Sequence, residues 1–183
     1  MSHHADAATR MHGAVEALRR ELGGLRAGRA TPGLVDRITV EYYGTTTPLR
    51  DLASLSVPEP RQLLIQPWDR SVVPAIEKAI QKSDLGIQPS SDGQVLRINL
   101  PPLTEERRKD LVRQVHKLEE EQKVAVRNCR RDAMEAIRDA VKKGGLSEDE
   151  ARREQDELQK LTDRHIAEIE GLVKEKEREV MQV

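Results

Sequence analysis

Apolar residues recur at steps of three and four along residues 104–143, a segment that no proline or glycine interrupts. They trace one side of a predicted helix: Leu111, Val115, Leu118, Ala125, Cys129, Ala133, Ile137 and Val141, with Gln122 in the one gap. Thr104 follows two prolines and is a candidate N-cap. A helix of this length extends over about 60 Å and needs other helices along its apolar side.

Two further segments have the same periodicity and supply those helices. Residues 5–27 form the first predicted helix, with apolar positions at Met11, Val15, Leu18, Leu22 and Leu25. Residues 148–181 form the last, which opens with a capping box at Ser147 and Glu150. Its apolar side consists of Ala151, Leu158, Leu161, Ile169, Leu172 and Val180. These patterns predict an antiparallel-type three-helix bundle.

The segment between the first two helices differs in character. It holds all nine prolines and all three aromatic residues of the chain. Alternating or β-branched runs predict strands at 37–42, 46–49, 53–57, 62–66 and 95–100. Residues 71–82 predict one helix with Pro74 in its first turn, and Asp92-Gly93 predicts a hairpin turn. This segment is therefore predicted to be a small α+β domain.

Together these elements predict a two-domain α+β protein. Residues 1–30 and 104–183 form the long three-helix bundle, and residues 31–103 form the inserted domain. Two short connections join the two, which predicts a hinge that is limited in direction. The hinge residues are Arg29, Ala30, Thr31, Pro101, Pro102, Leu103 and Thr104.

Charge is unevenly distributed although the formal net charge is only −1. Residues 1–30 carry a net charge of +2, residues 31–103 of −1, residues 104–143 of +3 and residues 144–183 of −5. Basic character therefore lies on the first two predicted bundle helices and acidic character on the last.

A cluster of cations lies on the long helix, away from the line of Cys129. Its members are Lys123, Arg127, Arg130 and Arg131, and spacings of three and four make them neighbours on the helix surface. Only Asp132 is acidic between Lys123 and Met134. For an isolated cluster of this size, a solvated polar face with ion pairs within the helix is the more common interpretation. The alternative is a phosphate-binding face, and the preference for arginine over lysine supports it, because the planar fork of arginine matches phosphate oxygens.

Features of catalytic, metal-binding and secreted proteins are absent from the sequence. There is no phosphate-binding glycine loop, and none of the five histidines has zinc-ligand spacing. The single cysteine, Cys129, is predicted to be a core residue. We expect no enzyme activity, no cofactor and no metal. No apolar run is long enough for a membrane span and no secretion signal is present, so a cytoplasmic protein is expected.

Two functional classes remain open from the residues alone. The predicted helices contain no aromatic residue, so a nucleic acid would be contacted through phosphates and duplex shape. The alternative is a coiled-coil adaptor or chaperone that offers its helices to protein partners.

Four long runs of the sequence are distinctive: residues 25–49 (LRAGRATPGLVDRITVEYYGTTTPL), 69–86 (DRSVVPAIEKAIQKSDLG), 101–133 and 147–163 (SEDEARREQDELQKLTD). These runs resemble the bacterial ribosome recycling factor family. The resemblance covers the chain from about residue 10 to its end. Cys129 stands where the family usually has an aliphatic residue.

The resemblance implies both an architecture and a function. The fold would be near-L-shaped, with a three-helix bundle and a β/α/β sandwich joined by a hinge. The protein would bind the post-termination ribosome on its large subunit and, with elongation factor G and GTP, split it into subunits. A monomer is expected, because the sequence gives no clear case for an oligomer. The rRNA-contacting arginines of the family map to Arg127 and Arg130, with Arg131 beside them, and to Arg26 and Arg29.

Overall fold

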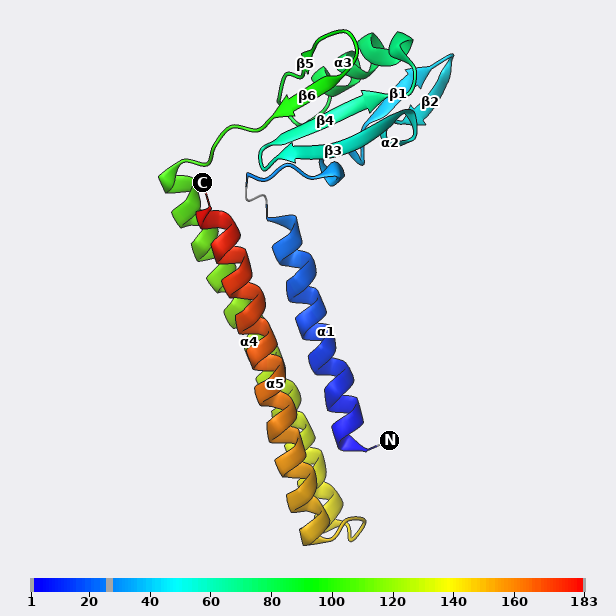
Figure 1. Ribbon diagram of the computed structural model, residues 1–183. Helices are drawn as coiled ribbons and strands as arrows, with labels where there is room; N and C mark the ends of the chain where they lie inside the picture. The colour runs from blue at the N-terminus through cyan, green and yellow to red at the C-terminus, as the bar shows by residue number, and fades with distance from the viewer. Residues whose placement is uncertain (1, 26–27, 183) are drawn as a thin grey trace. The chain divides into compact units, whose positions relative to one another are not determined.

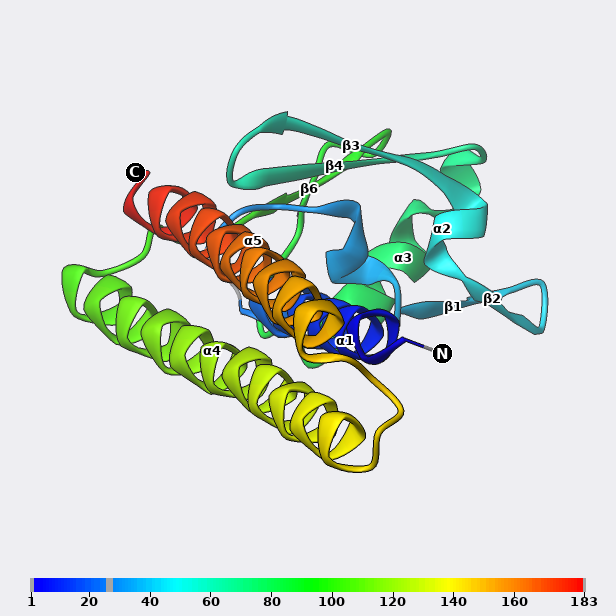
Figure 2. The same ribbon diagram turned by 90° about the horizontal axis from the view of Figure 1, so that it is seen from below.

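The computed structural model describes residues 2–25 and 28–182, and the chain divides into two compact units (Figures 1 and 2). Unit 1 comprises residues 1–27 and 104–183, and unit 2 comprises residues 28–103. Each unit has its own buried apolar cluster, so each is described by itself.

Unit 1 is a bundle of three long helices, as the periodicity predicted. They are α1 (His3–Gly24), α4 (Glu105–Lys142) and α5 (Glu148–Met181). The three helices contact one another pairwise, and α4 runs antiparallel to both α1 and α5 (Figure 1). Packing against the other two helices gives each amphipathic helix the partner that it lacks alone.

The helix ends follow from local sequence chemistry. Thr104 caps α4 by accepting a hydrogen bond from the backbone N–H of Arg107 at 3.1 Å. Ser147 and Glu150 form the predicted capping box, with each side chain accepting from the other residue's backbone N–H. Gly144, at φ +76°, ends α4 in the left-handed conformation that suits glycine. The first helix ends at Gly24, earlier than the predicted residue 27.

The core of unit 1 differs from the predicted apolar stripes at a few positions. On α4, Val126 is fully buried, whereas Ala125 is only partly buried. On α5, Val173, Thr162 and His165 are buried. Thr162 Oγ1 donates to the carbonyl of Leu158, and His165 Nδ1 donates to that of Leu161, both at 2.8 Å. Because carbonyls of the same helix accept these hydrogen bonds, both polar atoms have partners although they are buried.

Unit 2 contains a two-stranded and a four-stranded antiparallel sheet. Strand β1 (Thr39–Tyr42) pairs with β2 (Thr45–Pro48). The second sheet has the order β3-β4-β6-β5, from β3 (Ala53–Glu59), β4 (Gln62–Pro67), β6 (Leu96–Asn99) and β5 (Ser90–Ser91). Helix α3 (Val73–Gln81) buries Val73, Ile76 and Ile80 in the core that both sheets share.

The α+β prediction is therefore confirmed, and all five predicted strands are present with small shifts at their ends. The short helix α2 (Leu49–Leu52) and strand β5 were not predicted. The Asp92-Gly93 turn is present: Asp92 Oδ1 accepts from the backbone N–H groups of Val95 and Gln94 at 2.9 Å each. Those two hydrogen bonds lower the pKa of Asp92.

The connections to unit 1 lie against each other at the edge of unit 2. Ala30 is buried, and its N–H donates to the carbonyl of Pro60 at 2.8 Å. Gly28 has φ +72°, and a Cβ placed on it would stand 3.0 Å from Cγ of Leu103. A residue with a side chain would be strained there both by its backbone conformation and by this contact.

Candidate nucleic-acid interface

Four of the six predicted phosphate-contacting cations lie on α4. These are Lys123, Arg127, Arg130 and Arg131. Arg29 is exposed in the first connection, in unit 2, and Arg26 lies outside the described residues. The geometry of the candidate interface is therefore that of the four α4 side chains.

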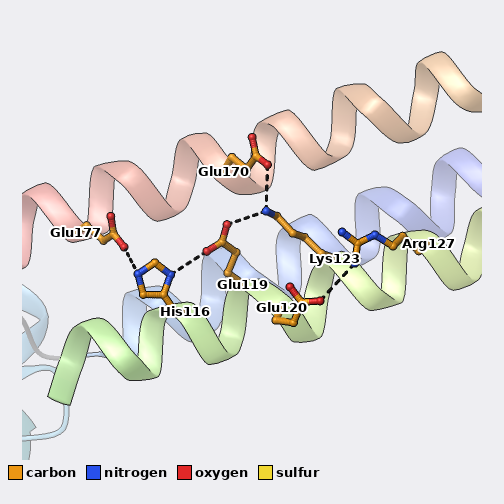
Figure 3. Close-up of polar contacts among 7 residues, drawn as sticks. All are labelled: His116, Glu119, Glu120, Lys123, Arg127, Glu170 and Glu177. Atoms are coloured by element: carbon orange, nitrogen blue, oxygen red, sulfur yellow. Dashed lines mark hydrogen bonds and ion pairs between the residues drawn. The ribbon is translucent and has the colours of Figure 1, made fainter. Parts of the chain in front are cut away.

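Lys123 is embedded among carboxylates, which the sequence did not lead us to expect. Its side chain is only 15% exposed, and its Nζ lies 2.9 Å from Glu119 Oε1 and 3.0 Å from Glu170 Oε1 on α5 (Figure 3). The hydrogen bond to Glu119 is the main cause of a raised Lys123 pKa. We expected a basic cluster without nearby carboxylates, and this was wrong for Lys123. Glu170 lies on α5, far from Lys123 in the sequence, so the residue spacing along α4 did not reveal it.

Arg127 and Arg131 are exposed on the side of α4 away from the buried apolar residues. Arg127 donates from Nη1 to Glu120 Oε1 at 3.3 Å, and both side chains are more than half exposed (Figure 3). An ion pair between two exposed side chains contributes little to the free energy of folding. Arg127 can therefore exchange Glu120 for another anion. Among the described residues, none forms an ion pair with Arg131. These two arginines present their charge to solvent.

Arg130 is half-buried against α5, so the expectation that it points away from the packing face was wrong. Its Nη1 donates to Oε1 of Gln159 at 2.7 Å. Its Nε is buried and has no hydrogen-bond partner in the described part of the chain. Arg130 precedes the buried Ile137 by seven residues, two helical turns, and therefore lies on nearly the same line of the helix.

A polar seam runs between α4 and α5. We use this name for His116, Lys123 and Arg130 on α4 with Glu177, Glu170 and Gln159 on α5. His116 Nε2 lies 2.6 Å from Glu177 Oε1, and Nδ1 lies 3.1 Å from Glu119 Oε2 (Figure 3). The α4 members follow one another at heptad steps, as do Glu170 and Glu177, which is the spacing of flanking positions in coiled coils.

The α5 members of this seam were not predicted from the sequence. The signal that could have found them was the seven-residue spacing of His116, Lys123 and Arg130 beside the same spacing of Glu170 and Glu177.

Glu119 contacts both His116 and Lys123 through its carboxylate. Burial opposes its ionisation, but the hydrogen bonds from Lys123 and His116 outweigh burial and lower the Glu119 pKa.

Other candidate chemistry is limited in the described residues. Cys129 is buried, and that burial raises the pKa of its thiol, so it behaves as a small core residue. Within residues 2–25 and 28–182, no group of three His, Cys, Asp or Glu side chains is placed to hold a metal ion. No described helix combines the length and the apolar character needed to cross a membrane.

Unit 2 carries exposed aromatic side chains that the sequence analysis did not single out. Tyr43 is 82% and Trp68 73% exposed. Tyr43 occupies the β1–β2 turn with φ +48°, and its ring packs edge-on against that of Tyr42 at a centroid distance of 4.6 Å. Solvent-exposed aromatics are thus confined to unit 2 among the described residues.

Comparison with known proteins agrees with the resemblance. Residues 18–181 match the family model described as ribosome recycling factor. The chain is 60% identical over 179 residues to the ribosome-recycling factor of Shouchella clausii, covering 98% of this chain and 97% of that one.

Solved structures show the same similarity in three dimensions. A solution structure of the ribosome recycling factor aligns with a TM-score of 0.74 at 49% identity, over 99% of this chain and 96% of that one. A second aligns over the full length of both chains with a TM-score of 0.62 at 46% identity. It belongs to models of the T. thermophilus factor and E. coli elongation factor G bound to the E. coli post-termination complex.

Proposed function

The chain belongs to the ribosome recycling factor family, and from that premise we propose that it binds the post-termination ribosome on the large subunit. With elongation factor G and GTP it splits that ribosome into subunits for another round of translation. The observation that carries this function is the family match over residues 18–181, together with 60% identity to a curated member across 98% of the chain.

The chain is a translation factor and not an enzyme. Its sequence has no glycine-rich phosphate loop of the kind that holds a nucleotide. The hydrolysis of GTP therefore belongs to elongation factor G, and this chain acts by binding. Its place of action is the cytoplasm, where ribosomes terminate translation.

The rRNA contact is assigned to the arginines of α4. Arg127 and Arg131 present exposed charge, and Arg130 is held at the edge of the same face. Arg26 and Arg29, which follow α1 in the sequence, are proposed as further contacts. Lys123 has a different part: its two carboxylate partners support a role in holding α4 to α5.

Movement between the two units is proposed as part of splitting. Residues 29–31 and 101–104 stay the proposed hinge, because they form the two connections between the units. Ala30 is anchored to unit 2 by its hydrogen bond to Pro60. We therefore propose that the first connection bends before Ala30, near Gly28, and not at Ala30 itself.

Co-sedimentation with purified large subunits tests this function directly, and light scattering of post-termination ribosomes measures splitting. We expect binding by the protein alone, and splitting only when elongation factor G and GTP are both added. The protein alone should hydrolyse neither GTP nor ATP above a heat-inactivated control. Hydrolysis by the protein itself, or a failure to bind large subunits, would contradict the proposed function.

A further inference from the structure

Three neighbouring cations of α4 have different kinds of partner. Lys123 contacts two carboxylates, Glu119 and Glu170. Arg127 contacts one carboxylate, that of Glu120. Arg130 alone of the three is held by a neutral group, the side-chain amide of Gln159.

The orientation of the Gln159 amide is determined by its two neighbours. A guanidinium only donates hydrogen bonds, so the atom 2.7 Å from Arg130 Nη1 must be the amide oxygen. A carboxylate only accepts, so the atom 2.9 Å from Asp163 Oδ1 must be the amide nitrogen. Asp163 therefore fixes the amide so that its oxygen faces Arg130.

This contact fixes the direction of the Arg130 side chain. Its Nε is buried and its Nη1 is engaged by Gln159. Within the described part of the chain, Nη2 makes no hydrogen bond and is not buried. The guanidinium is thus held at its Nη1 atom, and Nη2 keeps its donor capacity for a ligand.

We propose that Gln159 is a positioning residue for the phosphate contact of Arg130, with Asp163 orienting Gln159. The inference rests on the proposed rRNA-binding function. A neutral acceptor restrains the long side chain before binding, so less rotamer freedom is lost when the phosphate arrives. Because the Gln159 amide is neutral, it leaves the positive charge of Arg130 uncompensated. A carboxylate in its place, like those that contact Lys123, would compete with the phosphate for the guanidinium.

The test measures affinity for purified large subunits by co-sedimentation. Gln159→Met keeps the length of the side chain and removes both hydrogen bonds. We expect affinity to fall about three- to tenfold, the cost of ordering one long side chain on binding. The matched control is Gln155→Met, one helical turn earlier on α5, which should bind as wild type does.

A double-mutant cycle separates positioning from a general loss of structure. In an Arg130→Ala background, Gln159→Met should have no further effect, because the side chain that it positions is gone. In an Arg127→Ala background it should retain its full effect. The slope of log affinity against log salt should stay at the wild-type value in Gln159→Met, because the phosphate contact is weakened but still made.

Gln159→Glu provides a second variant that keeps size and an acceptor atom, and so guards against a failure of Gln159→Met to fold. We expect it to bind more weakly than wild type, because its carboxylate competes with phosphate for Arg130. Wild-type affinity in Gln159→Glu, or an equal loss from Gln159→Met with and without Arg130, would overturn the proposal. Failure of the wild-type protein to bind large subunits would instead contradict the proposed function.

Discussion

Lys123 Nζ on α4 lies 3.0 Å from Glu170 Oε1 on α5, although 47 residues separate them in the sequence. A second carboxylate, Glu119, lies 2.9 Å from the same nitrogen. A cation that sequence spacing grouped with the phosphate-contacting arginines is therefore part of the contact between two bundle helices. Substitution of Lys123 is therefore expected to affect stability, whereas substitution of the neighbouring arginines is expected to affect rRNA binding.

Lys123→Met should affect stability and leave rRNA binding nearly unchanged. Removing the ammonium leaves two partly buried carboxylates without their cation, so we expect the free energy of unfolding to fall by about 1 kcal/mol. Affinity for large subunits should change by less than about twofold. Urea unfolding and co-sedimentation measure the two effects. Lys117→Met, exposed on the same helix, is the control and should change stability by less than about 0.5 kcal/mol. A tenfold loss of affinity in Lys123→Met would return Lys123 to the rRNA contacts.

Glu119→Gln should reduce the acid sensitivity of the protein. The folded-state pKa of Glu119 lies below its ordinary value of 4.5, so its ionised form stabilises the fold fully above that pH. This stabilisation disappears as the pH falls through the lowered folded pKa. The variant should therefore be less stable than wild type at neutral pH and approach it in acid. Urea unfolding from neutral pH to about pH 3 measures the difference, and a constant gap across that range would contradict the assignment.

Arg130→Ala and Arg127→Ala should each weaken large-subunit binding about tenfold or more. Each arginine can make a charge-assisted hydrogen bond to phosphate worth about 1.5–3 kcal/mol. The slope of log affinity against log salt should fall by about 0.7–0.9 for each phosphate that the variant no longer binds. Arg138→Ala, further along the exposed side of α4, is the control and should weaken binding less.

Stability should distinguish the same two arginine variants. Arg127 is exposed, so Arg127→Ala should change the free energy of unfolding by no more than about 0.5 kcal/mol. Arg130→Ala removes the hydrogen bond to Gln159 and the partly buried side chain, and should cost about 1 kcal/mol. If Arg130→Ala bound normally, the α4 face would be a solvated surface.

Cross-linking the two units should block splitting while binding persists. Cys129 is the only cysteine and is buried, so a Cys129→Ala background allows one new cysteine to be placed in each unit. We expect the cross-linked protein to bind large subunits within a few-fold of wild type and to lose splitting activity. Reduction of the cross-link should restore splitting and serves as the control. Normal splitting by the cross-linked form would remove the hinge from the mechanism.

Trp68 should report on unit 2 without disturbing it. It is the only tryptophan, and its side chain is 73% exposed. Its fluorescence should be quenched readily by iodide in the folded protein. Trp68→Phe should change the free energy of unfolding by no more than about 0.5 kcal/mol, as for other exposed positions. Emission that is shielded from iodide would show that the indole is covered in solution.

Local signals in the sequence predicted most of the elements correctly. Thr104, Gly144 and the Ser147–Glu150 capping box marked the helix ends because each acts on backbone groups within a few residues. Helix α2, only four residues long, and the two-residue strand β5 were missed because such short segments show no measurable periodicity.

The candidate site was predicted only in part. Periodicity on one helix separates a buried side from an exposed side, and it correctly placed Arg127 and Arg131 in solvent. Periodicity could not show whether Lys123 and Arg130 are buried, because they lie between these two sides. There the neighbouring helix decides whether a side chain is covered.

The sequence by itself determined the helices with their caps, the α+β middle segment and the family to which the chain belongs. Only the tertiary structure decided that Glu170 neutralises Lys123 and that Gln159 restrains Arg130. The physical reason is that caps and periodicity depend on atoms a few residues apart, whereas these contacts depend on the register of two antiparallel helices. That register is set by the buried side chains of the whole bundle acting together.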